Sequence, residues 1–176
     1  MLSGAGRWSG PNVEITRFSV DDLTPAYIGW LNDPEVVRFS NQRFCRHDRE
    51  SCLRYLASFD GSDNLFLSIR RVGGHAVGTM TVYASPAHGT ADVGILIGER
   101  ALWGHGLGQE AWNLIVDWLC RHPAIRKVTA GCSLPNTGMV RLMERSGMTL
   151  ECVRREQEIV EGRSADVVSY ARFHDA

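Results

Sequence analysis

The chain has 176 residues, which is the length of one ordinary domain and too short for two. Apolar residues make up 44% of the sequence and charged residues 22%, a balance that excludes disordered and collagen-like chains. The net charge is −1, so the chain lacks the positive field with which nucleic-acid-binding proteins hold phosphates. We therefore expect one globular domain whose main partner is not a nucleic acid.

The N-terminal residues show no targeting segment. No stretch of the chain approaches the roughly 18 consecutive apolar residues of a membrane span, and residues 1–11 lack the apolar part of a secretion signal. The sequence therefore predicts a cytoplasmic protein without a membrane partner, with a flexible arm over 1–11 and a single domain over 12–174. The five cysteines form no CxxC pair, which predicts reduced thiols and no metal site.

The first half of the domain is expected to combine strands with short helices. Residues 13–18 alternate apolar and polar side chains as a strand does. Two short helices are predicted after the pairs Thr24-Pro25 and Asp33-Pro34, because a capping residue followed by proline is a common helix start. The periodicity then predicts a helix over 48–59 and an antiparallel meander of strands over 65–70, 76–83 and 92–97.

A long helix is the clearest element of the second half. It begins at Gly106, and its apolar residues keep helical spacing up to the His122-Pro123 step. A strand over 127–132, a helix over 137–146 and a hairpin of strands 150–160 and 165–173 follow. This order predicts a mixed α/β (α+β) domain with a largely antiparallel, twisted sheet of about seven strands and about four or five flanking helices.

Three glycines lie between a strand and the long helix. Gly104, Gly106 and Gly108 would let the backbone approach an anion closely, where the first-turn N–H groups and the positive end of the helix face it. The spacing predicts a pyrophosphate seat, although it also fits a plain tight turn. A Walker A loop is disfavoured because no lysine lies near Gly108, and a dinucleotide fingerprint is disfavoured because residue 109 is Gln.

The glycine loop resembles the phosphate loop of the GNAT superfamily of acyl-CoA-dependent N-acetyltransferases. That loop reads Gln or Arg, two variable residues, Gly, one variable residue, and Gly or Ala; residues 103–108 read WGHGLG, with Trp103 in the Gln or Arg position. Segments 30–36 (WLNDPEV), 136–147 and 162–170 are similar, in the right order, to the branch that includes the ribosomal-protein alanine N-acetyltransferases. The resemblance covers about residues 13 to 173 and implies the GNAT fold.

The resemblance implies that acetyl-CoA is the co-substrate and that no metal is needed. In the family, the strand before the phosphate loop is splayed from its neighbour, and its backbone binds the pantetheine arm as another strand would. Asn136 matches a family asparagine beside that arm, although it also fits a helix N-cap. The implied cofactor residues are Ile95, Leu96, Ile97, Trp103, Gly104, His105, Gly106, Leu107, Gly108 and Asn136.

The family transfers the acetyl group directly to a primary amine while a base removes the amine proton. Asp92 lies where many relatives have a glutamate and is the first candidate for this base, although it also fits a solvated strand-end carboxylate. Met143 and Met139 replace the Tyr and Ser that protonate the CoA thiolate in relatives. We interpret His105 as a surface residue beside the CoA phosphates, and Cys132 as a buried strand residue rather than a nucleophile.

The acceptor is expected in a groove walled by segment 24–59 and the two terminal strands. Branch similarity favours a peptide N-terminus or the amine of an amino sugar, and homodimers are common among relatives. The alternative is a non-catalytic acyl-CoA sensor or partner module. Trp30 and Asp33 are the predicted acceptor contacts, and the acids expected to attract a cationic amine are Asp33, Glu35, Asp48, Asp92 and Asp166.

Overall fold

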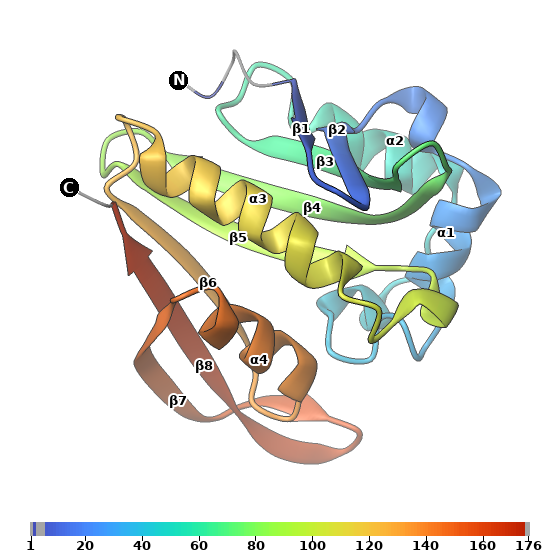
Figure 1. Cartoon of the computed structure of the whole chain (residues 1–176). Helices are drawn as coiled ribbons and strands as arrows, with labels where there is room; N and C mark the ends of the chain where they lie inside the picture. The colour runs from blue at the N-terminus through green and yellow to red at the C-terminus, as the bar shows by residue number, and fades with distance from the viewer. Residues whose placement is uncertain (1, 3–5, 175–176) are drawn as a thin grey trace.

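The computed structural model describes residues 2 and 6–174. Its described strands form one sheet in the order β1-β2-β3-β4-β5-β6-β8-β7, in which all neighbours are antiparallel except β5 and β6 (Figure 1). The strands are β1 (Arg7–Ser9), β2 (Val13–Arg17), β3 (Leu65–Arg71), β4 (Ala76–Ser85), β5 (Thr90–Ile97), β6 (Lys127–Ser133), β7 (Thr149–Val160) and β8 (Arg163–Phe173). The α-helices are α1 (Pro25–Asn32), α2 (Arg49–Ala57), α3 (Leu107–Arg121) and α4 (Thr137–Arg145).

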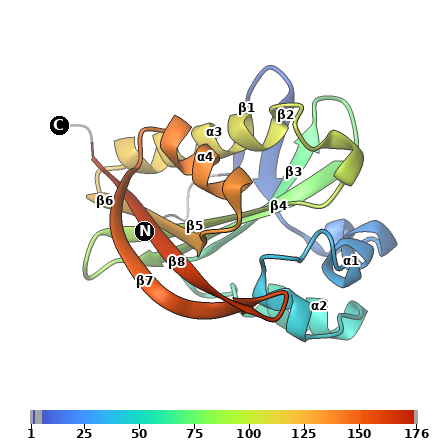
Figure 2. The same cartoon turned by 90° about the horizontal axis from the view of Figure 1, so that it is seen from below.

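Two hydrophobic clusters hold helices on opposite faces of the sheet. Helices α3 and α4 cover one face, and α1 and α2 lie on the other (Figure 2). On the α3 face, Trp112 and Ile115 are fully buried in the cluster that contains Met80 of β4. On the α1 face, Tyr27 and Phe66 belong to a smaller aromatic cluster. Within the described residues, no helix is long and apolar enough to span a membrane.

Strands β5 and β6 separate after a short parallel contact. They pair only over residues 90–92 and 127–129, and beyond this point they diverge (Figure 1). Each strand continues because it is held on its other side, β5 by β4 up to Ile97 and β6 by β8 up to Ser133. The resulting gap, called here the β5–β6 opening, leaves residues 93–97 without a strand partner on one edge. The splayed strand implied by the resemblance is therefore confirmed.

The predicted arm is wrong for residues 7–9, which form β1 and pair with β2. Trp8 anchors this strand because its ring meets that of Trp118 edge-on, with centroids 5.0 Å apart. Glu110 holds the following turn, since its carboxylate accepts the N–H groups of Asn12 and Val13 at 2.8 and 3.1 Å. The additional strand raises the observed number to eight. Residues 1 and 3–5 of the predicted arm lie outside the described residues.

The helix predicted after Asp33-Pro34 is also wrong, because residues 34–39 form turns. Asp33 ends α1 instead of starting a new helix. Its side chain accepts the N–H of Glu35 at 2.9 Å, and this local bond favours a turn over a helix. The neighbouring helix starts are confirmed: Thr24 caps α1, and Asp48 caps α2 by accepting the N–H of Ser51 at 2.8 Å.

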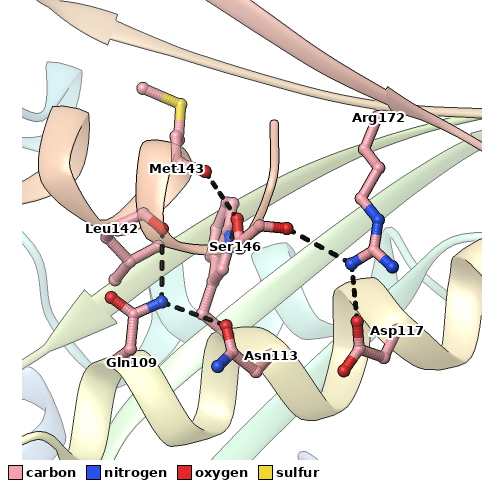
Figure 3. A network of polar contacts seen from close by, with 8 residues as sticks. Gln109, Asn113, Asp117, Leu142, Met143, Ser146 and Arg172 are labelled. Atoms are coloured by element: carbon pink, nitrogen blue, oxygen red, sulfur yellow. Dashed lines mark hydrogen bonds and ion pairs between the residues drawn. The ribbon is translucent and has the colours of Figure 1, made fainter. Parts of the chain in front are cut away.

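A polar network ties α4 to α3 and β8 (Figure 3). Gln109 of α3 donates to the carbonyl of Leu142 at 3.2 Å, and Arg172 of β8 donates to the carbonyl of Ser146 at 3.2 Å. The Ser146 hydroxyl lies between them, where it accepts from the buried Trp112 indole at 3.0 Å and donates to a carbonyl of its own helix at 2.7 Å. The network fixes the helix that follows β6.

We predict that Ser146→Ala lowers the free energy of unfolding by about 1–3 kcal/mol, because it leaves the buried Trp112 N–H without an acceptor. Chemical denaturation measures this change. Ser58→Ala is the matched control: Ser58 also caps a helix end and donates to the carbonyl three residues earlier, at 2.6 Å, but it has no buried partner. Equal losses for the two variants would contradict a stabilising role of the Trp112 contact.

Candidate active site

The glycine loop presents free backbone N–H groups at the start of α3. Gly104 and Gly106 have left-handed φ angles of 80° and 83°, and a Cβ at either position would meet nothing within 4 Å. Within the described part of the chain, the N–H groups of Gly104, Gly106, Leu107 and Gly108 donate to no carbonyl or side chain. Unpaired N–H groups and the positive helix end together favour an anion here.

The set of unpaired N–H groups in the loop is smaller than the predicted phosphate-binding set, which is residues 103–108. The N–H groups of Trp103 and His105 already donate to carbonyls of the preceding turn, at 3.1 and 3.4 Å. The Trp103 indole donates to the carbonyl of Ile97 at 2.8 Å, which anchors the loop to the end of β5. His105 is exposed, as predicted for a surface position, and its contact with CoA phosphates stays a prediction.

The strand beside the opening is held by its side chains. Ile95 and Ile97 pack against the cluster under α3, whereas Leu96 packs against the aromatic cluster of α1 and α2. Both faces of β5 are therefore fixed, while its backbone toward the β5–β6 opening has no strand partner beyond Asp92. This geometry is what the predicted contact with a pantetheine arm requires, and the contact itself stays a prediction.

Asp92 lies at the point where β5 and β6 separate. Its carboxylate accepts the Thr129 hydroxyl of β6 at 2.7 Å, and its register partner on β4 is Tyr83. Partial desolvation raises the pKa of the Asp92 carboxyl, and the bond from Thr129 opposes this rise. A carboxyl with a raised pKa is better matched to proton transfer near neutral pH than an ordinary surface aspartate.

A cavity of about 560 Å³ lies on the α1 and α2 side of β4 and β5. Gly94 forms part of its floor, where a Cβ would lie 2.8 Å from the Thr81 hydroxyl. The Tyr55 and Tyr83 hydroxyls in its wall are 2.8 Å apart. Burial raises the pKa of Tyr55 well above its ordinary value, so this hydroxyl stays neutral. Neither tyrosine was predicted as a site residue, because aromatic side chains at these positions of α2 and β4 are typical of a core.

The family profile of the acetyltransferase (GNAT) domain matches residues 12–149, which is most of the chain. The chain belongs to the GNAT acetyltransferase family. The splayed strand, the glycine loop and the mixed sheet are thus those of an acetyltransferase, as the sequence resemblance implied. No curated protein matches the chain. Among the described residues, no group of three or more His, Cys, Asp or Glu side chains could hold a metal ion.

Three solved structures illustrate how widely the fold of this acetyltransferase is shared. A GNAT acetyltransferase from Bacillus anthracis is 18% identical, with 96% of this chain and 98% of that chain covered and a TM-score of 0.81. The ribosomal-protein alpha-N-acetyltransferase RimL, solved with coenzyme A, is 17% identical. The match covers 94% of this chain and 96% of RimL, with a TM-score of 0.82. Spermidine N-acetyltransferase from Vibrio cholerae, solved with CoA and spermine, is 14% identical. The match covers 94% of this chain and 97% of that enzyme, with a TM-score of 0.83.

The predicted acceptor residues lie outside the cavity of this acetyltransferase. The Trp30 ring covers Gly98 at the end of β5, where a Cβ would be 2.0 Å from the ring. Asp33 pairs with Arg100 at 3.7 Å. Neither residue lines the 560 Å³ cavity or the neighbouring cavity of about 510 Å³, which extends to the β7–β8 turn. Their contact with an acceptor stays a prediction.

Asn136 caps α4, since its side chain accepts the N–H of Met139 at 3.2 Å. The capping interpretation is therefore confirmed, and a contact with CoA stays a prediction. Met143 is fully buried in the main core, so the position of the usual tyrosine is taken by a packing residue. Burial raises the pKa of the Cys132 thiol to about 12, which keeps this thiol protonated and argues against a nucleophilic role.

Proposed function

We propose that this acetyltransferase uses acetyl-CoA and acetylates a primary amine that enters from the 560 Å³ cavity. The β5–β6 opening carries this proposal, because Gly94, Ile95 and Leu96 border the opening and also line the cavity, and the same strand leads into the glycine loop. A thioester reaching through the opening would meet an amine beside Asp92. Two structural neighbours, RimL and the spermidine acetyltransferase, were solved with coenzyme A, which supports the choice of cofactor.

Different segments of the chain bind the cofactor and accept the proton. The N–H groups of Gly104, Gly106, Leu107 and Gly108 bind the pyrophosphate, and the free edge of β5 holds the pantetheine arm. Bound acetyl-CoA supplies an activated acyl group whose carbonyl carbon is attacked by the amine. Asp92 takes the proton that the amine loses, either directly or through one water. Because Met143 and Met139 have no proton to give, solvent protonates the leaving thiolate.

Release of free CoA thiol tests the proposal. We expect turnover with at least one member of an amine panel that contains N-terminal peptides, amino sugars with and without a nucleotide, polyamines and aminoglycosides. Thermal-shift titration with acetyl-CoA, run in parallel, reports binding. Binding without turnover across the panel would contradict the enzyme and support a non-catalytic acyl-CoA module, and no binding would contradict the assignment of the glycine loop.

A further inference from the structure

The side chains around the 560 Å³ cavity carry an unexpected charge. Two basic residues, Arg46 and His47, line this cavity, and none of its 18 lining residues is Asp or Glu. The rest of the polar lining is neutral and consists of hydroxyl, thiol and amide side chains. A polycationic acceptor would therefore meet no counter-charge there and would be repelled by a guanidinium.

Four of the five acids expected to attract a cationic amine have polar partners in the fold. None of the five lines the 560 Å³ cavity. Asp48 caps α2 and Asp33 pairs with Arg100, as described above. Asp166 accepts from Arg155 and from the N–H of Glu156, at 3.2 and 2.9 Å. Asp92 is bonded to Thr129, and Glu35 lines only the second cavity.

Arg46 differs from the other arginines on this side of the molecule. Arg38 pairs with Glu161 at 2.8 Å, Arg43 donates to the carbonyls of Ser40 and Ile159, and Arg49 donates to the carbonyl of Leu23. Within the described part of the chain, Arg46 has no hydrogen-bond or ion-pair partner. It lines both cavities, and so it lies where they meet. Its guanidinium is available to a ligand that fills either one.

We propose that the amine acceptor carries a carboxylate or phosphate group and that Arg46 determines this specificity by binding it. The inference rests on the proposed acetyl transfer and narrows its acceptor. A guanidinium binds either anion through two parallel N–H bonds, so one side chain orients the acceptor as well as attracting it. The hydroxyls of Ser40 and Ser51 and the amide of Gln42 in the same wall are suited to the remaining polar groups of such a ligand.

Matched pairs of acceptors test the charge preference. Glucosamine 6-phosphate is compared with glucosamine, and an N-terminal tetrapeptide amide with Asp at its second position is compared with the same peptide carrying Asn or Lys. We expect kcat/KM to be about tenfold higher for the anionic member of the recognised pair, mainly through KM, in line with a charge-assisted hydrogen bond. The two pairs distinguish a sugar phosphate from an acidic peptide as the acceptor. Spermidine is tested beside them as a polycationic acceptor.

Variants of Arg46 assign the preference to this side chain. We expect Arg46→Gln to remove most of the preference, Arg46→Glu to invert it toward the cationic member, and Arg46→Lys to retain part of it. Arg121→Gln is the control, since Arg121 is an exposed arginine at the far end of α3. If Arg46 had only a structural role, its variants would lower kcat/KM equally for both acceptors of a pair and would leave the preference in place.

Calorimetric titration of the CoA-saturated protein with the same pairs gives a second readout that needs no turnover. Tighter binding of the anionic member, lost in Arg46→Gln, supports the inference. Equal affinity within both pairs, or a preference for spermidine, overturns it. Failure of the proposed acetyl transfer is distinguished by the absence of CoA release with every acceptor, whichever way the titrations fall.

Discussion

Gly106→Asp is expected to weaken acetyl-CoA binding by about 100-fold or more. The new carboxylate would stand beside the pyrophosphate at the start of α3, and two like charges about 4 Å apart repel by roughly 4 kcal/mol at a protein surface. A Cβ at Gly106 meets no atom within 4 Å, so the side chain fits without a clash. Thermal-shift and calorimetric titration with acetyl-CoA measure the loss.

Two controls separate the charge from backbone strain in this prediction. Gly106→Asn has the same shape and the same left-handed backbone angle without the charge, and we expect a loss no greater than about tenfold. Gly61→Asp places an aspartate at another glycine with a left-handed φ, 68°, and open surroundings, and it should leave acetyl-CoA affinity unchanged. Unchanged affinity in Gly106→Asp would contradict the phosphate seat.

Asp92→Asn is expected to lower kcat by about 100-fold to 10,000-fold, the range typical of a lost general base. The amide keeps the shape of the carboxyl and still accepts the Thr129 hydroxyl, so the local structure should persist. Stopped-assay turnover with a saturating acceptor measures the effect. A kcat within threefold of the parent would remove Asp92 from the mechanism and return it to a strand-end carboxylate.

If Asp92 is the base, the pH dependence of kcat/KM has a definite sign. A base must be deprotonated, so kcat/KM should fall as the pH drops through the raised pKa of Asp92, at a higher pH than for an ordinary aspartate. Thr129→Val removes the donor that lowers this pKa and should move the acidic limb to higher pH. Asp92→Asn should abolish this acidic limb of the pH profile. If the limb persists in the variant, it belongs to another titrating group.

Stability should respond to Asp92 in the opposite direction from activity. Because the pKa of Asp92 is raised in the folded protein, its contribution to stability is fully present at low pH and is lost as the pH rises through the folded pKa. Above that pKa the folded chain holds a desolvated carboxylate. Asp92→Asn removes this penalty, so its Tm at pH 7 should equal or exceed that of the parent, and a large fall in Tm would contradict this.

Local signals in the sequence explain why most elements could be predicted. Caps such as Thr24 and Asp48, the glycine loop before α3 and the alternation in the strands each act within a few residues, and the structure uses each of them. β1 escaped prediction because three residues carry too little periodicity. Its stability comes from Trp118 and Glu110, which lie about one hundred positions away in the sequence.

The candidate site divides in the same way. The loop and the splayed strand are contiguous segments with a recognisable pattern, so residues 95–97 and 104–108 could be located from the sequence. The 560 Å³ cavity is assembled from α1, segment 40–47, α2, β3, β4 and β5, and no spacing reveals that Arg46, Tyr55 and Tyr83 line one space. The charge of this space could not be inferred from acidic residues counted along the chain, because four of them have other partners in the fold and Glu35 lines only the second cavity.

A crystal structure of the protein with coenzyme A tests the central claim most directly. The account predicts that the pyrophosphate accepts from the N–H groups of Gly104, Gly106, Leu107 and Gly108. It also predicts that the pantetheine arm lies in the β5–β6 opening along residues 95–97, and that the sulfur ends near Asp92 with the 560 Å³ cavity beyond it. A pyrophosphate bound away from the glycine loop, or an arm that does not enter the opening, would contradict the account.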